Sequence, residues 1–237
     1  MITLSVVSSV IGTAIVLYMD WFPVEASSAA KPIDRLYDVL LIFSVPIFVL
    51  VMAVAIYSVV EFRAKPGDTG DGAPIHGNTR LEVFWVTIPF LIVSALAVYS
   101  WIVLDDIEAK QPDELVVKVR GQQFTWFFEY PAEKVKSSEL VLPKDQPVHF
   151  EITTEDVIHS FWVPEFRLKS DAVPGLTTNV RTTPTRIGRY TVVCAELCGL
   201  GHSTMRQDVQ VIDESEWDSW LERQRKSPDR IGQAPRK

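Results

Sequence analysis

Both cysteines of the chain lie in one short segment, Cys194–Met205, together with one of its four histidines. The segment reads CAELCGLGHSTM and brings together two thiols, an imidazole and a thioether. These are the ligand types that copper, a soft or borderline metal, prefers. Three residues separate the cysteines, so one turn of loop can aim both sulfurs at one point. Gly199 and Gly201 allow the tight backbone that would return His202 and Met205 to that point.

A second histidine, His159, lies 35 residues before the first cysteine, between two strand-like segments. A loop of a neighbouring strand can bring it to the cysteines, because copper-carrying sandwiches gather their ligands at one end of the barrel. A single blue-copper ion uses one Cys, two His and an axial Met. Two sulfurs can instead bridge two copper ions, with one histidine for each ion and two weak ligands, Met205 and the Glu196 carbonyl. The spacing therefore favours a copper pair.

Three other interpretations of the two cysteines stay open on the sequence alone. A disulfide is compatible with export, but it leaves the positions of the histidines and of Met205 unexplained. A structural zinc site is chemically possible, but it has no use for Met205. Its ligands would be Cys194, Cys198, His202 and His159. A site for one copper ion is the third alternative.

The residues that must position this loop alternate between apolar and polar side chains. Beyond Pro112 the chain forms short runs of period two, punctuated by Pro, Gly and Asp. Such runs predict β-strands, and their spacing is typical of a sandwich. We therefore place one Greek-key β-sandwich or barrel at residues 111–214, and a C-terminal helix with a basic tail at 215–237. The clearest runs are LVVKVRGQQFTWFFEY, PVHFEITTED, LTTNVRTT, GRYTVVCAE and RQDVQVID.

Two stretches without charged residues, Val39–Val60 and Val83–Leu104, precede the sandwich. Each is long enough to cross a hydrocarbon core of about 30 Å as a helix that rises about 1.5 Å per residue. Pro46 and Pro89 lie inside them, which helices in lipid tolerate better than soluble helices do. We predict a two-span transmembrane hairpin over residues 36–106, with a buried soluble hairpin as the alternative.

The first apolar run, Met1–Met19, allows two interpretations. It lacks the basic start of a signal peptide, yet the small residues Ala26–Ala30 resemble a cleavage zone. Residues 1–28 are thus either a signal peptide or an extra N-terminal transmembrane helix.

The loop charges predict the orientation in the membrane. The loop that joins the two spans is basic and is predicted to lie inside, whereas the segment after the second span opens with acids, so the sandwich is exported. The basic residues are Arg63, Lys65 and Arg80, and the acidic ones are Asp105, Asp106 and Glu108.

The exported part carries a net negative charge. From Gln111 to Asp218, 17 Asp and Glu stand against 11 Lys and Arg. This sign disfavours a nucleic-acid partner and favours a basic protein partner, because opposite fields raise encounter rates. A docking face of acidic side chains would comprise Asp156, Glu155, Glu129 and Asp171.

With these features together, the sequence resembles subunit II of the haem-copper cytochrome c oxidases, in which C-x-E-x-C-x-x-x-H-x-x-M marks the binuclear copper centre called CuA. The resemblance covers nearly the whole chain from about residue 36. Besides the hairpin and the loop, it rests on four segments: Glu82-x-x-Trp85-x-x-x-Pro89, Gly121-Gln-Gln-Phe-Thr-Trp126, Asp156–Pro164 and Leu168–Gly175.

The resemblance implies an α+β membrane protein with a cupredoxin-like exported domain, and it implies residue roles. The copper A ligands would be His159, Cys194, Glu196 through its carbonyl, Cys198, His202 and Met205. The Glu196 carboxylate would point toward a magnesium ion shared with the catalytic subunit, or else be merely solvated. Glu82 would lie near the cytoplasmic mouth of a proton path, or else simply reach water from a helix end.

The sequence departs from the family at the residue where electrons are thought to arrive from cytochrome c. The family's strand has a tryptophan directly after the Gln, whereas this chain has Phe124 there and Trp126 two positions on. Strand alternation predicts that both rings lie on the same face. Either ring is a candidate for electron uptake, and simple packing is the alternative role.

The family's function follows as an expectation. The chain would accept single electrons from cytochrome c and pass them to subunit I, which would carry the haem, reduce O2 to water and translocate protons. Subunit III and membrane lipid would be further partners, in the plasma membrane of a bacterium with the copper domain on the periplasmic side. The alternatives are the CuA subunit of a nitric oxide reductase, a copper-free quinol oxidase subunit, which both cysteines disfavour, and a non-redox sandwich on a membrane stalk.

Overall fold

The computed structural model describes residues 2–64, 66–67, 70–72 and 74–226. They belong to two compact units. One comprises the chain up to Asp20 together with Arg35–Val103, and the other comprises Trp21–Asp34 together with the chain from Leu104 onward. The predicted basic tail beyond Lys226 lies outside the described residues.

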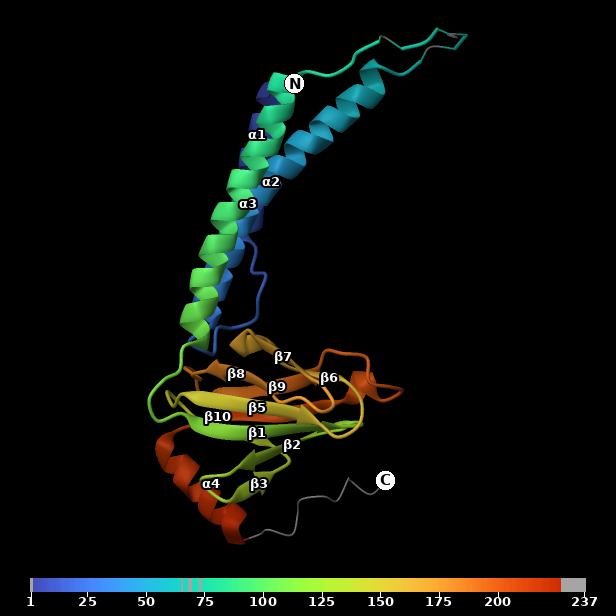
Figure 1. The fold of residues 1–237 in the computed structure, drawn as a ribbon. Helices are drawn as coiled ribbons and strands as arrows, with labels where there is room; N and C mark the ends of the chain where they lie inside the picture. Colours follow the sequence, from blue (N-terminus) through green and yellow to red (C-terminus); the bar gives the residue numbers. More distant parts are fainter. Residues whose placement is uncertain (1, 65, 68–69, 73, 227–237) are drawn as a thin grey trace. The chain divides into compact units, whose positions relative to one another are not determined.

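The first unit is helical (Figure 1). Its residues form α1 (Ile2–Tyr18) and most of α2 (Ala30–Glu61) and α3 (Thr79–Glu108), while the first turn of α2 and the last turn of α3 belong to the second unit. Helices α2 and α3 are long and apolar enough to cross a membrane, and they include Pro46 and Pro89 as the hairpin prediction required. Helix α1 is a shorter apolar helix of 17 residues. Whether it is a signal peptide or a further span remains a prediction.

The second unit is a sandwich of two five-stranded sheets, and it confirms the predicted β-sandwich fold. One sheet has the order β3-β2-β1-β5-β8 and the other the order β4-β10-β9-β6-β7. The strands of the first sheet are β1 (Leu115–Gln122), β2 (Thr125–Tyr130), β3 (Val135–Ser137), β5 (Val148–Thr154) and β8 (Thr178–Thr182). Those of the second are β4 (Leu140–Pro143), β6 (His159–Val163), β7 (Leu168–Ala172), β9 (Gly188–Cys194) and β10 (Arg206–Ile212).

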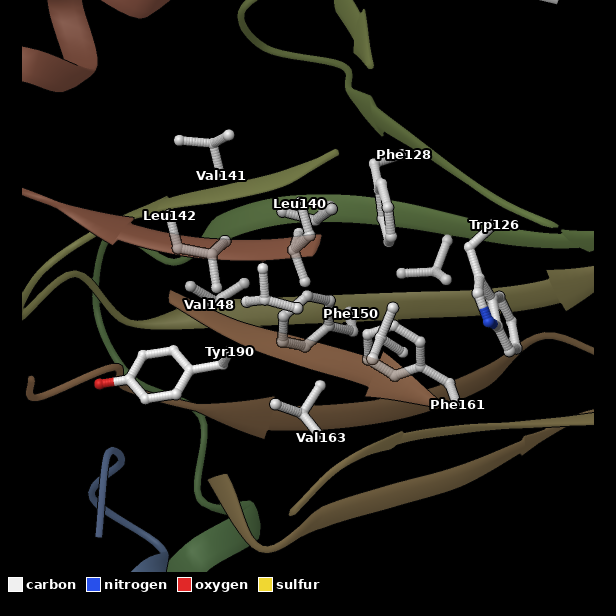
Figure 2. Packing of buried hydrophobic residues seen from close by; sticks show 14 of the residues in the cluster. Trp126, Phe128, Leu140, Val141, Leu142, Val148, Phe150, Phe161, Val163 and Tyr190 are labelled. Atoms are coloured by element: carbon white, nitrogen blue, oxygen red, sulfur yellow. The ribbon is translucent and has the colours of Figure 1, made fainter. Parts of the chain in front are cut away.

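Aromatic and aliphatic side chains fill the space between the two sheets (Figure 2). The Phe161 ring lies at the centre, with ring centroids 5.5 Å from Trp126, 6.4 Å from Phe128 and 5.5 Å from Phe150. All four side chains are buried, as the period-two alternation predicted for one face of each strand. Edge-to-face and tilted packing of such rings adds to the free energy that their buried area contributes.

A C-terminal helix, α4 (Glu214–Lys226), closes one side of the sandwich. Its Trp217 and Trp220 pack against Tyr130, with ring centroids 5.5 Å and 5.3 Å away. The Tyr130 hydroxyl donates to the Val141 carbonyl at 2.8 Å and accepts from the Val141 amide at 2.9 Å. Because this hydroxyl is buried, burial raises the pKa of Tyr130 well above its usual value.

The chain reverses direction where the sequence predicted one continuous aromatic strand. Strands β1 and β2 pair antiparallel with Gln122 opposite Thr125, so Gln123 and Phe124 form the turn between them. The alternation rule does not extend across a turn, and the prediction that Phe124 and Trp126 share a face is wrong. Phe124 is 38% exposed, whereas Trp126 is completely buried.

Strand pairing positions the cysteine loop. Strands β6 and β9 pair with Phe161 opposite Cys194, which brings His159, the first residue of β6, beside the end of β9. Strands β9 and β10 pair antiparallel, and the loop that joins them holds the remaining candidate ligands. Met205 directly precedes β10, and its carbonyl accepts the amide of Cys194 at 3.1 Å. The two strands therefore close both ends of the loop.

Candidate metal centre

The predicted sulfur and imidazole ligands converge at the end of the second sheet. The two cysteine Sγ atoms lie 3.8 Å apart. Cys194 Sγ lies 3.8 Å from His159 Nδ1, and Cys198 Sγ lies 3.7 Å from His202 Nδ1. Each thiol thus has its own imidazole partner. His159, Cys194 and Cys198 present ligand atoms within 4.8 Å of one another, and all three residues are buried.

Two weaker donors complete the cluster. Met205 Sδ lies 3.7 Å from Cys198 Sγ, and the Glu196 carbonyl lies 3.2 Å from Cys194 Sγ. Met205 is fully buried. The structure thus brings all six sequence-predicted copper ligands into one cluster, while the Glu196 side chain is exposed beside it.

The loop reaches this shape through tight local turns. His202–Thr204 form a single 3-10 turn, and the His202 amide donates to the Gly199 carbonyl at 3.1 Å. Gly199 has a φ of +131°, which favours glycine because it has no Cβ. A Cβ at Gly201 would lie 2.5 Å from the Phe124 ring. Gly199 is therefore needed for its positive φ, and Gly201 is needed because a side chain there would clash with Phe124 of the β1–β2 turn.

Asp156 holds the imidazole of His159 from the side opposite to the cysteines. His159 Nε2 lies 2.9 Å from Asp156 Oδ1, while the other ring nitrogen faces Cys194. A partner on one ring nitrogen fixes the ring orientation and leaves the other nitrogen for a metal. Burial acts to raise the pKa of Asp156, but hydrogen bonds from Gln123, His159, Val157 and Thr154 outweigh it and lower the pKa to about 2. The carboxylate is therefore ionised at neutral pH.

The two cysteines are free thiols and not a disulfide. Their sulfur separation of 3.8 Å is far beyond the bonded distance of about 2.05 Å. Burial, and then the neighbouring Cys194 thiol, raises the pKa of Cys198 to about 11. A buried pair of thiols of this kind must release protons when it binds a metal.

The residues present fit copper. The cluster offers two thiols, two imidazoles, a thioether and a carbonyl in one small buried volume. A tetrahedral zinc site would use the cysteines and histidines, but it would leave the buried Met205 sulfur without a role. Thioether and thiolate ligands together are characteristic of copper.

The remaining predicted residues lie apart from the cluster or at its edge. Trp126 packs edge-on against His159, with ring centroids 5.8 Å apart, while the partly exposed Phe124 ring lies against Gly199 and Gly201 of the loop. Glu82 lies in the first turn of α3, where Oε1 accepts the Asn78 amide at 3.1 Å. That contact gives Glu82 a helix-capping role, whether or not it also serves a proton path.

The predicted acidic docking face is largely neutralised. Glu155 pairs with Arg120 at 2.7 Å, and Glu129 lies 3.5 Å from Lys136. Asp156 is engaged by Gln123 and His159, so of the four acids only Asp171 has no ion pair among the described residues. The sequence gives the number of charged side chains but not which of them form ion pairs.

Sequence reasoning missed one residue at the site, Gln123. Its side chain Nε2 donates to the Cys198 carbonyl at 2.5 Å, and its backbone amide donates to Asp156 Oδ2 at 2.8 Å. The sequence pattern places it only within the predicted strand Gly121–Trp126. Its position in a turn that faces the loop depends on contacts 75 and 33 residues away, which no local pattern reveals.

Comparisons with known proteins agree with this arrangement. The chain matches the family "Cytochrome C oxidase subunit II, transmembrane domain" over residues 12–103. It matches "Cytochrome C oxidase subunit II, periplasmic domain" over residues 132–212. The two matches cover the long helices and most of the sandwich.

Several relatives are named cytochrome c oxidase subunit 2, and another is named as a quinol oxidase subunit. Cytochrome c oxidase subunit 2 of Thermostichus vulcanus is 34% identical over 252 aligned positions, which cover 84% of this chain and 76% of that protein. The protein of the same name from Synechocystis sp. is 31% identical over 271 positions, covering 92% and 82%. A probable quinol oxidase subunit 2 of Staphylococcus saprophyticus is 31% identical over 205 positions, covering 84% and 55%. With a membrane hairpin, a β-sandwich and a cysteine, histidine and methionine cluster in the matching places, the chain belongs to the cytochrome c oxidase subunit II family.

Proposed function

We propose that this subunit takes up single electrons from cytochrome c at a binuclear CuA centre and passes them to a haem-copper catalytic subunit. The observation that carries the proposal is the pair of buried cysteine sulfurs 3.8 Å apart, each with its own imidazole within 3.8 Å. A single copper ion would need one thiol only. Two thiols this close can be shared by two ions.

The chain's own residues would hold the metal rigidly. His159 is positioned by Asp156 and strand β6, Cys194 by strand β9, and Met205 by the start of β10. When bound, the copper pair would supply one-electron redox chemistry. A scaffold that fixes ligands in both oxidation states keeps the structural change per electron small, which favours rapid transfer.

The partners follow from the same proposal. Oxygen reduction and proton translocation would belong to subunit I, which would carry the haem, with subunit III as a further partner in the plasma membrane of a bacterium. The Glu196 carboxylate, exposed next to the loop, would face a magnesium ion shared with subunit I. Glu82 would lie near the cytoplasmic mouth of a proton path.

Phe124 is the better of the two candidates for electron uptake. It is 38% exposed and lies against the cysteine loop, whereas Trp126 is buried behind His159. An exposed ring can contact a protein donor directly. The role proposed for Trp126 is packing that supports the His159 imidazole.

A copper count with electron spin resonance of the purified full chain in detergent tests the proposal. Reconstituted protein should bind two copper ions per chain, and the unpaired electron should be split by two equivalent copper nuclei. One ion per chain, or a cystine without metal, would contradict it.

A second assay separates the rival oxidoreductases of the same family. The isolated complex should oxidise reduced cytochrome c with O2 as acceptor. Turnover with nitric oxide instead of O2 would favour the nitric oxide reductase alternative, and oxidation of quinol without copper would favour a quinol oxidase.

A further inference from the structure

The β1–β2 turn connects two copper-ligand segments that are far apart in sequence. The Gln123 side chain Nε2 donates to the carbonyl of Cys198, and the Gln123 backbone amide donates to Asp156 Oδ2. The other oxygen of Asp156 contacts His159 Nε2 at 2.9 Å. One residue therefore reaches the Cys198 loop directly and the His159 ring through a single carboxylate.

The Cys198 loop depends on this outside support. Its backbone hydrogen bonds lie at its beginning, at Cys194 and Ala195, and in its second half, from Gly199 to Met205. The carbonyl of Cys198 lies between these two parts and is held by the Gln123 amide group. The turn also lies directly on the loop, since a Cβ at Gly199 would come within 2.9 Å of Gln123 Nε2.

We propose that Gln123 is a positioning residue that sets the distance between the Cys198 and His159 sides of the metal centre. The proposal rests on the proposed copper function and names a residue that does not itself bind metal. Groups that orient ligands commonly contribute about 10- to 100-fold to metal affinity or activity. The Nε2 hydrogen bond, and not the volume of the side chain, should account for the contribution of Gln123 to copper binding.

The test compares Gln123→Leu, which keeps a side chain of similar size but removes the donor, with Gln122→Leu at the preceding exposed position. We expect Gln123→Leu to weaken copper binding about 10-fold or more. We also expect it to make the two copper hyperfine splittings unequal. Gln122→Leu should change neither, and both variants should unfold at about the same temperature.

Hydrogen exchange of the copper-free full chain provides a readout that does not depend on the metal. Amides from Cys198 to Met205 should exchange faster in Gln123→Leu than in the unchanged protein or in Gln122→Leu. Equal exchange, together with equal copper affinity and equal splitting, would overturn the proposal. If the unchanged protein binds no copper pair, the proposed function fails, whereas the exchange measurement still decides whether Gln123 holds the loop.

A separate observation concerns the segment between α1 and α2. Trp21–Asp34 belongs to the sandwich unit. The Ala26 amide donates to the Glu165 carbonyl at 3.0 Å, and the Ala26 carbonyl accepts the Thr185 amide at 2.9 Å. Ala26 is completely buried and is part of the hydrophobic core. The segment is thus hydrogen-bonded to the β-sandwich and packed into its core.

Arg167 fastens the same segment at its two ends. Its side chain is 5% exposed and binds both carboxylate oxygens of Asp34, at 2.7 Å and 2.8 Å. It also donates to the Pro23 carbonyl at 2.7 Å and lies over the Phe22 ring, 4.9 Å from its centroid. A cut anywhere between Ala26 and Ala30 would separate Pro23 and Phe22 from Asp34 and leave a buried guanidinium with half of its partners.

We infer that Trp21–Asp34 stays in the mature protein as a structural part of the exported domain, so the Ala26–Ala30 zone is not a cleavage site. The intact mass and N-terminal sequence of the subunit purified from membranes test this. A mature chain that begins at or before Trp21, with or without α1, supports the inference. A mature chain that begins after Trp21 overturns it, and this result would not affect the copper assignment.

Discussion

The interior of the sandwich and its copper end are stabilised in different ways. Phe150 of one sheet and Phe161 of the other are fully buried in the interior, with their ring centroids 5.5 Å apart. At the copper end, Leu197 is 78% exposed and Leu200 is fully exposed, while the candidate ligands of the same loop are held by short turns and single hydrogen bonds. Apolar burial has no preferred direction, whereas hydrogen bonds fix angles and distances. The first should therefore set stability and the second the metal geometry.

The largest expected effect separates these roles completely. Replacing Cys194 or Cys198 by Ser should abolish electron uptake while the sandwich still folds and reaches the membrane, because Ser is close to Cys in size and the ring contacts between the sheets stay in place. Stopped-flow oxidation of reduced cytochrome c by the complex measures electron uptake, and thermal unfolding measures whether the sandwich is folded. Retained oxidase turnover in either variant would count against the assignment.

A core substitution should give the opposite result. Phe150→Ala should lower the free energy of unfolding by about 3–5 kcal/mol, because it removes a buried ring and leaves a cavity. The copper spectrum of the protein that remains folded should be unchanged. Leu176→Ala, at a side chain that is 60% exposed, serves as the control and should cost no more than about 0.5 kcal/mol. A spectrum altered in Phe150→Ala would show that core and site are coupled.

The pH dependence of stability should also come from the interior. Burial raises the pKa of Tyr130 in the folded protein above its value of 10.0 in the unfolded chain. The unfolded state therefore loses this proton first, and the contribution of Tyr130 to stability, complete below pH 10, should be lost as the pH rises further. Denaturant unfolding from pH 8 to pH 11 measures the loss. Tyr130→Phe should be less stable at neutral pH, but its free energy of unfolding should fall less steeply as the pH rises. An equally steep fall in this variant would mean that other groups cause the pH dependence.

The smallest expected effect lies on the exposed rim of the site. Phe124→Leu should slow the second-order oxidation of cytochrome c by about three- to tenfold, because single interface changes alter association rates over a limited range. Trp126→Leu should instead lower stability through the lost ring contacts, with a smaller change in that rate. If Trp126→Leu slowed the oxidation of cytochrome c more than Phe124→Leu, Trp126 would be the better candidate for electron uptake.

The family, the two spans and the clustering of the six candidate ligands could be predicted, because each rests mainly on local patterns. Uncharged runs predicted α2 and α3, alternation predicted the strands, and the spacing of thiols, imidazole and thioether predicted the loop. The same logic failed at Gln123 and Phe124. Alternation assumes an unbroken strand, and the pairing of Gln122 with Thr125 makes a turn there.

The sequence by itself determined which side chains could bind metal and which segments could enter a membrane, since composition and spacing are properties of neighbouring residues. Only the tertiary structure decided what supports them. The Ser27 hydroxyl donates to a carbonyl 139 residues away, Arg167 binds Asp34 across 133 residues, and Gln123 reaches Cys198 across 75. Such partners are brought together by the tertiary packing of the sandwich unit, because no local periodicity specifies which distant groups become neighbours.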